Sequence, residues 1–197
     1  MTQKKTTELR KEEIIEAALG LVEQSGIDSL SIADIANAIN LVPSAIYRHF
    51  QSKEAIIQSI IEYVGKILNK NILYVLKNER ETQKRLKLLL DFHFQFVGGK
   101  RIIPQILFSV LGSNKNLFLK QEMVAITLGY VEAIKNIIAE GQSKDEIAAD
   151  IDPNSAALLF FGLIQPQVIF NQNSNAPIEN YQDTSWQIYW KGISQVS

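Results

Sequence analysis

Apolar residues recur three or four positions apart along most of the chain, the spacing that gives a helix one apolar face. The pattern predicts a first helix that ends near Gly26. Its apolar face is Ile14, Ala18, Leu21 and Val22. Further long helices are predicted over residues 52–76, 81–97, 117–140, 153–170 and 181–196. Because no segment alternates between apolar and polar residues as a half-buried strand does, the fold class is predicted to be all-α.

Residues 31–54 have the pattern of two short helices joined by a tight turn and followed by the start of a third helix. Ser31 and Asp34 form a capping-box type of start for the first short helix. Asn40 can adopt the left-handed conformation that a tight turn requires, and Pro43 suits the first position of the next helix. This order of elements is a helix-turn-helix, whose second helix enters the major groove of DNA.

The second short helix is expected to have a buried side and an outward side. Ile46 and Phe50 lie four positions apart and are expected to point inward. The outward positions are then Ser44, Ala45, Arg48 and His49, with Tyr47 at the margin.

Lys53 falls in the first turn of the following helix, where a cation opposes the helix dipole. Two interpretations stay open for this lysine. A phosphate group could lie in front of the helix and bind it, or the lysine could be solvated and offset by Glu54.

The charge balance requires any DNA affinity to come from a local surface. The net charge of the whole chain is −1, which gives no general attraction to nucleic acid. Residues 1–54 contain six lysines and arginines against eight carboxylates. The basic residues cluster in the N-terminal arm and around the second short helix, so a positive face on a net-acidic domain is expected.

Composition excludes several other classes of protein. The chain has no cysteine, which excludes disulfides and thiolate metal sites, and its two histidines make a zinc site unexpected. No Ser/His/Asp set, glycine-rich phosphate loop or suitably spaced carboxylate pair indicates an enzyme. The longest apolar run, residues 156–164, is far shorter than the ~20 residues of a membrane helix. We therefore expect a soluble, cytoplasmic protein without a metal or cofactor.

Several segments together carry a family resemblance. They are residues 10–15, 26–31, 34–36, 46–50 and 52–54, of which Tyr47-Arg48-His49-Phe50 followed by Ser52-Lys53-Glu54 is the most specific. In these segments the chain resembles the DNA-binding domain of TetR-family transcriptional regulators over about residues 10–60. Asn40 and Val42 depart from the commonest family pattern, which has glycine and a small polar residue at these positions.

The resemblance implies two kinds of DNA contact. Residues that would touch phosphates are Tyr47, His49 and Lys53, with Ser31 helping at its helix N-terminus. Residues that would face the bases are Val42, Pro43, Ser44, Ala45 and Arg48. Phosphate contacts fix the register of a protein on DNA, whereas base contacts read its sequence.

The resemblance also implies a homodimer. Residues 1–55 would form the DNA-binding domain and residues 56–197 a helical effector-binding and dimerisation domain, with the helix over 52–76 connecting them. The family forms a four-helix bundle across a two-fold axis, which predicts dimer contacts through helices near 121–140 and 153–170. Asp152 and Pro153 suit the N-cap and first position of the second of these helices. A plain buried core helix is the alternative.

The family's C-terminal domain usually encloses a small-molecule site. Candidate lining residues are Phe92, His93, Phe96, Phe108, Phe118, Tyr130, Phe161 and Gln165. The same aromatic residues could instead belong to the core, and His93 could be an ordinary hydrogen-bonded core histidine. The resemblance predicts a repressor that binds a palindromic operator and is released by a small, mainly hydrophobic effector. The alternative is a DNA-binding protein that responds to a protein partner and has no small-molecule effector.

Overall fold

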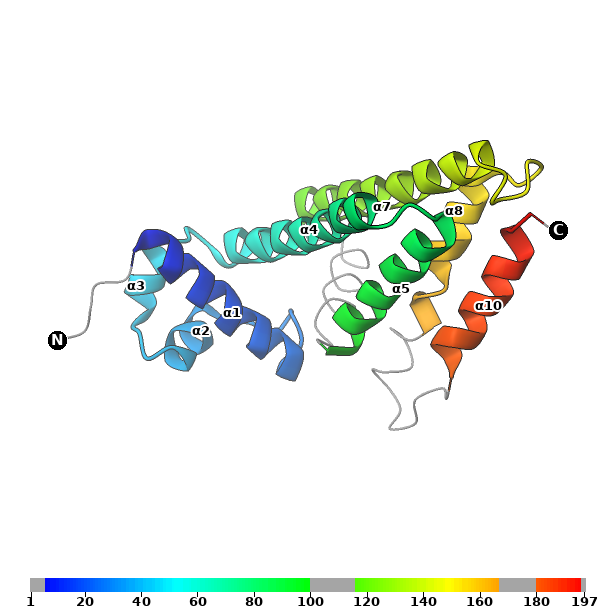
Figure 1. Cartoon of the computed structure of the whole chain (residues 1–197). Coiled ribbons are helices and arrows are strands. Elements are labelled where there is room, and N and C mark those ends of the chain that lie inside the picture. Colours follow the sequence, from blue (N-terminus) through cyan, green and yellow to red (C-terminus); the bar gives the residue numbers. More distant parts are fainter. Residues whose placement is uncertain (1–5, 100–115, 167–179, 196–197) are drawn as a thin grey trace. The chain divides into compact units, whose positions relative to one another are not determined.

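The structure, a computed structural model, describes residues 6–99, 116–166 and 180–195 (Figure 1). Within these ranges the fold is all-α, as predicted. The helices are α1 (Thr7–Ser25), α2 (Ile32–Ala38), α3 (Pro43–Tyr47), α4 (Lys53–Asn78), α5 (Thr82–Gly99), α7 (Leu117–Ser143), α8 (Pro153–Gly162) and α10 (Tyr181–Ile193).

The described residues form two compact units. The first contains residues 6–65 and 116–123, and the second contains 66–99, 124–166 and 180–195. The predicted domain limit at residue 55 differs from this division because α4 is one continuous helix. Its first turns bury Ile56, Ile57 and Ile60 in the first unit, so that unit extends about ten residues further along α4.

The long helices end within three residues of their predicted limits, except the helix predicted over 153–170. The helix predicted over 153–170 begins as expected, with the Asp152 carboxylate accepting the Ser155 N–H at 2.8 Å and Pro153 in the first position. It ends at Gly162, a residue of low helix propensity, so its predicted length is wrong. Residues 167–170 lie outside the described ranges. The last helix ends at Ile193, short of the predicted residue 196.

The core of the first unit comes from α1, the helix-turn-helix and the start of α4. Ile14, Ala18 and Val22 of α1 are fully buried, as predicted, whereas Leu21 is half-buried and Leu19 takes its place in the core. The helix ends at Gly26, whose positive φ of 79° favours glycine over other residues.

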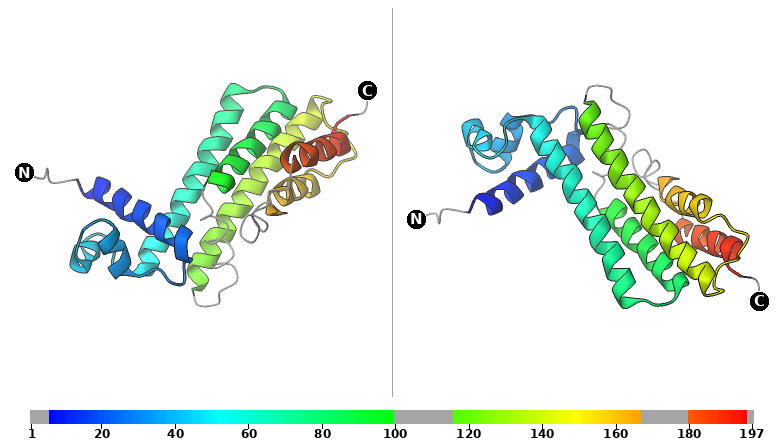
Figure 2. Two further views of the ribbon diagram at one scale, coloured as in Figure 1. Left: turned by 90° about the horizontal axis from the view of Figure 1, so that it is seen from below. Right: turned by 90° about the horizontal axis from the view of Figure 1, so that it is seen from above.

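The second unit packs α5 beside α7 and the second half of α4, and α10 beside α8 (Figures 1 and 2). α8 and α10 are joined by a hydrogen bond from the Tyr189 hydroxyl to the Ala156 carbonyl at 3.0 Å. The core side chains from α5, α7, α8 and α10 include Leu86, Leu89, Leu90, Ile134, Ile138, Ala157, Phe160 and Trp186.

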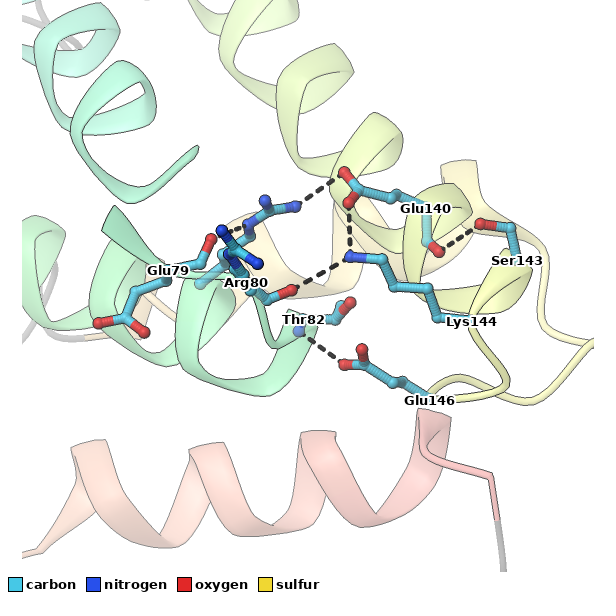
Figure 3. A network of polar contacts seen from close by, with 8 residues as sticks. Glu79, Arg80, Thr82, Glu140, Ser143, Lys144 and Glu146 are labelled. Carbon is cyan, nitrogen blue, oxygen red and sulfur yellow. Dashed lines mark hydrogen bonds and ion pairs between the residues drawn. The ribbon is translucent and has the colours of Figure 1, made fainter. Parts of the chain in front are cut away.

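A polar cluster fixes the turn between α4 and α5 to the end of α7 (Figure 3). The nearly buried Arg85 donates to the Glu79 carbonyl and to the Glu140 carboxylate, both at 2.7 Å. Lys144 donates to the same carboxylate at 2.6 Å and to the Arg80 carbonyl at 3.1 Å. The hydrogen bond from Lys144, together with Arg85, holds the pKa of the Glu140 carboxyl below its usual value. The cluster therefore holds α5 against α7.

Gly141 allows α7 to approach α5 closely, so Gly141→Ala is expected to destabilise the protein by about 1–3 kcal/mol. An added Cβ would lie 2.7 Å from Cγ2 and 2.9 Å from Oγ1 of Thr82. Without this contact, replacing a helical glycine with alanine normally stabilises a helix. Urea unfolding of Gly141→Ala, Thr82→Ala and the double variant measures the effect. Thr82→Ala should largely remove the loss, and an equal loss in both backgrounds would contradict the contact.

Candidate functional site

The helix-turn-helix is set by local hydrogen bonds and backbone conformation, as the sequence predicts. The Ser31 hydroxyl accepts the Asp34 N–H at 3.1 Å and donates to the Asp34 carboxylate at 2.6 Å, which begins α2. Asn40 has a φ of 54°, the left-handed conformation of the tight turn. Pro43 is the first residue of α3, after Val42 as N-cap. These features turn α3 away from α2 and expose one of its sides.

The exposed side of α3 carries most of the side chains that the sequence assigns to DNA. Ile46 and Phe50 are buried and anchor the helix in the first unit, as predicted. Val42 and Tyr47 are 62% and 54% exposed despite their apolar character. The other exposed residues there are Pro43, Ser44 and Arg48, whereas Ala45 and His49 are half-buried. The face is short and has one cationic side chain, Arg48.

Lys53 is tied to the protein rather than free in solvent. Its ammonium donates to the Asp28 carbonyl at 3.2 Å, which links the turn after α1 to the start of α4. Ser52 caps α4 by accepting the Ala55 N–H at 3.2 Å. Backbone and Ser52 hydrogen bonds, with a smaller contribution from Lys53, lower the pKa of the Glu54 carboxyl. The start of α4 is thus held in place beside the helix-turn-helix.

Two of the residues assigned to phosphates have restricted chemistry. The Ser31 hydroxyl already donates and accepts within α2, so it is not free to bind a phosphate without giving up a capping bond. The Nδ1 atom of His49 is buried and has no hydrogen-bond partner, which leaves Nε2 as the nitrogen that could reach a phosphate.

The structure brings three of the predicted effector residues together inside the second unit. His93 and Tyr130 are buried, and Nδ1 of His93 lies 3.4 Å from the Tyr130 hydroxyl. The Phe161 ring meets the His93 ring edge-on, with centroids 6.4 Å apart. Phe92, the residue before His93 on α5, contacts the Tyr74 ring edge-on, with ring centroids 5.6 Å apart. A polar pair therefore lies within an aromatic and aliphatic core.

The other predicted effector residues are not part of this group in the described structure. Phe118 lies in the first unit and is 54% exposed, so it is separate from the buried group. Gln165 is half-buried directly after the two-residue turn that follows α8. Phe96 lies on α5, but its side chain is outside the described residues, as is the whole of Phe108.

Acid is expected to destabilise the protein through His93, since burial lowers its pKa from 6.5 to about 4. Between these values the unfolded chain binds a proton that the folded chain does not, so unfolding becomes more favourable as the pH falls. At about 1.36 kcal/mol per pKa unit, the loss reaches about 3 kcal/mol near pH 4. Urea unfolding at pH 8, 6 and 4 should show a smaller loss for His93→Gln than for the wild type. Parallel losses in the two proteins would rule out this role for His93.

Sequence reasoning missed an apolar groove between α8 and α10. The groove has a volume of about 580 Å³ and is lined by Leu159 and Leu163 from one side and Ile188 and Tyr189 from the other. Leu159 is 65% exposed and Ile188 is 70% exposed. Ile188 lies in the segment 181–196, whose sequence predicts only an amphipathic helix. Only the packing of α10 against α8 reveals that Ile188 faces outward beside leucines.

In the part of the chain that the structure describes, no group of three or more His, Cys, Asp or Glu side chains is arranged to hold a metal ion. No helix in these ranges is both long enough and apolar enough to cross a membrane.

Two family matches together cover most of the chain. Residues 14–60 match the family described as bacterial regulatory proteins, tetR family. Residues 60–174 match the family described as the C-terminal region of YsiA-like protein. The first match contains the helix-turn-helix, and the second contains α5, α7 and α8 with their buried polar pair.

Similar proteins align over most of their length. The fatty acid metabolism regulator protein of Bacillus subtilis (strain 168) is 26% identical over 157 residues, which cover 79% of this chain and 80% of that protein. The nucleoid occlusion factor SlmA of Shewanella amazonensis is 24% identical over 192 residues, which cover 94% of this chain and 95% of that protein.

Solved structures share the fold at low sequence identity. The transcriptional regulator FadR from Bacillus subtilis, in complex with stearoyl-CoA, has a TM-score of 0.76 at 24% identity and covers 92% of this chain and 98% of its own. AibR, in complex with isovaleryl coenzyme A and operator DNA, has a TM-score of 0.73 at 19% identity, with 91% and 97% covered.

Proposed function

Because the chain belongs to the TetR family of transcriptional regulators, we propose that it is a homodimeric repressor that binds a palindromic operator and is released by a fatty acyl-CoA. The observation that carries the DNA-binding part is the exposed side of α3, where Val42 and Tyr47 face solvent while Ile46 is fully buried. Large apolar and aromatic side chains exposed beside an arginine suit contact with DNA better than contact with water.

We assign two roles on this surface. Tyr47, His49 and Lys53 bind phosphates, and the hydrogen bond from Lys53 to Asp28 holds its ammonium in position before DNA arrives. The base-facing residues are Val42, Pro43, Ser44, Ala45 and Arg48. Arg48 is the only one of them with a charged side chain that can contact a base. Ser31 serves mainly as the N-cap of α2.

We assign the dimer contact to α8 and α10. The exposed residues Leu159 and Ile188 border an open groove, and Leu158 of α8 is also exposed, so covering these side chains removes a large apolar surface from water. Between residues 130 and 138, α7 directs its buried side chains into its own core, so it has less apolar surface left for a partner. A two-fold axis beside α8 and α10 presents two copies of α3 to a palindrome.

The effector assignment rests on chemistry and on similar proteins. FadR from Bacillus subtilis and AibR were solved with acyl-CoA compounds, and the regulator from Bacillus subtilis acts in fatty acid metabolism. In this chain the buried His93–Tyr130 pair offers hydrogen bonds to a carbonyl, and the apolar surroundings suit an acyl chain. The continuous α4 then transmits the change, because its residues belong to both units.

The experiment that tests the proposal starts from DNA fragments selected by the purified protein. Fluorescence anisotropy then measures operator affinity with no addition, with lauroyl-CoA and with coenzyme A alone. We expect the selected fragments to be palindromic. Lauroyl-CoA should weaken operator binding, whereas coenzyme A alone should not. Added salt should steeply reduce operator affinity, because phosphate contacts release counterions. A protein that selects no common sequence, or whose affinity lauroyl-CoA leaves unchanged, would contradict the proposal.

The similarity to SlmA along almost the whole chain favours a second candidate. In that case the protein binds DNA and responds to a protein partner without any small-molecule effector. Two results would support this candidate over the first. The protein would bind a specific DNA sequence with an affinity that lauroyl-CoA leaves unchanged, and a second protein would co-purify only with the DNA-bound form.

A further inference from the structure

The second half of α4 carries an unbalanced positive charge. Residues 66–78 contain three lysines and no carboxylate. Lys66, Lys70 and Lys77 are all exposed, and none of them forms an ion pair within the described ranges. At about 100° per residue they fall within an arc of about 40°, along roughly 17 Å of helix. We call these three residues the α4 lysine stripe.

Most other lysines of the second unit are paired. Lys84, Lys87, Lys135 and Lys144 lie 2.5–2.9 Å from the carboxylates of Glu81, Asp91, Glu132 and Glu140. Three like charges aligned on one helix repel one another, and no ion pair within the described residues offsets the repulsion. A surface of this kind attracts a ligand that carries several negative charges close together.

An aromatic contact joins the edge of the stripe to α5, the helix that carries the buried His93. Tyr74 lies on α4 between Lys70 and Lys77, is 51% exposed and contacts Phe92 edge-on at 5.6 Å. The next residue on α5, His93, contacts Tyr130 in the core. The exposed part of the Tyr74 ring is available to stack against a flat heterocycle.

We propose that the α4 lysine stripe binds the phosphates of the coenzyme A part of the effector, with Tyr74 against its adenine. The inference rests on the proposed acyl-CoA effector. It assigns the two ends of that molecule to different places in the second unit. The acyl chain lies near His93 and Tyr130, and the phosphorylated adenosine lies on the exposed side of α4. Recognition of both ends explains how a regulator distinguishes a thioester of coenzyme A from a free fatty acid.

The test compares two lauroyl thioesters, one with and one without the phosphorylated adenosine of coenzyme A. Isothermal titration of the full-length protein measures the affinity of lauroyl-CoA and of S-lauroyl-pantetheine, which keeps the thioester but has no phosphate or adenine. The variant is Lys66→Gln/Lys70→Gln/Lys77→Gln. The control, Lys84→Gln/Lys135→Gln/Lys191→Gln, removes the same charge from α5, α7 and α10.

We expect the wild type and the control to bind lauroyl-CoA at least about tenfold more tightly than the pantetheine thioester. The stripe variant should lose this preference while its affinity for the pantetheine thioester stays unchanged. A preference that survives in the stripe variant overturns the inference and leaves the acyl-CoA proposal standing. Equal weakening of both ligands also overturns it, because the lysines would then act on the fold. If the wild type binds neither ligand, the proposed effector itself is wrong and the inference falls with it.

Discussion

Replacing Leu159 with glutamate is expected to convert the protein from a dimer into a monomer that binds its operator at least about a hundredfold more weakly. Leu159 is 65% exposed on α8, so a glutamate there is tolerated by the isolated chain. In the proposed dimer, the same position lies under the partner. A buried charge without a partner costs about 3–5 kcal/mol, and the two-fold axis introduces it twice. The dimer dissociation constant should therefore rise by at least about four orders of magnitude.

The measurement is sedimentation equilibrium at micromolar concentration, with operator affinity from fluorescence anisotropy. Leu128→Glu is a matched control, because Leu128 is 60% exposed on α7, within the range 121–140 that the sequence predicts for the dimer. It should remain dimeric. If Leu128→Glu dissociates while Leu159→Glu stays dimeric, the interface lies on α7 and the assignment to α8 and α10 is wrong. Circular dichroism should show unchanged helix content in both variants.

Replacing Arg48 with alanine is expected to reduce operator affinity at least about thirtyfold and to relax sequence preference at one position in each half-site. Arg48 is exposed at the end of α3, and no ion pair engages it in the described residues. Its guanidinium can therefore form a bidentate contact with a base edge, worth about 1–3 kcal/mol. A dimer loses two such contacts, about 2–6 kcal/mol in total.

The control for Arg48→Ala is Lys191→Ala, which removes the same charge from α10, where the side chain is exposed. Anisotropy titrations with the selected operator and with substituted half-sites give both affinity and preference. Lys191→Ala should match the wild type. If Arg48→Ala binds within about threefold of the wild type and keeps its preference, the base contact is absent.

The helix-turn-helix could be predicted closely because its determinants are local. Ser31 caps α2 through a residue three positions away, and Asn40 and Pro43 set the turn and the start of α3 through their own backbone conformations. Each of these effects depends on a few consecutive residues. Ile46 and Phe50 are buried as expected because their spacing matches one side of a helix.

The C-terminal unit was harder to predict because its contacts join residues that are far apart in the sequence. Arg85 of α5 is nearly buried because Glu140, 55 residues further along the chain, meets it from α7. The sequence predicts that the third long helix ends at residue 140, but Gly141 lies inside α7, where its missing side chain leaves room for Thr82. Helical periodicity identifies which residues share a side, and the packing of other helices decides which side is covered.

In the proposed function, one molecule binds DNA and an acyl-CoA at separate places, and each ligand weakens the binding of the other. Calorimetric titration of lauroyl-CoA into the dimer, alone and saturated with its selected operator, tests this coupling most directly. Linkage requires the operator to weaken lauroyl-CoA binding by the same factor by which lauroyl-CoA weakens operator binding. We predict equal factors of at least about tenfold. Equal affinity for lauroyl-CoA with and without operator would contradict the claim.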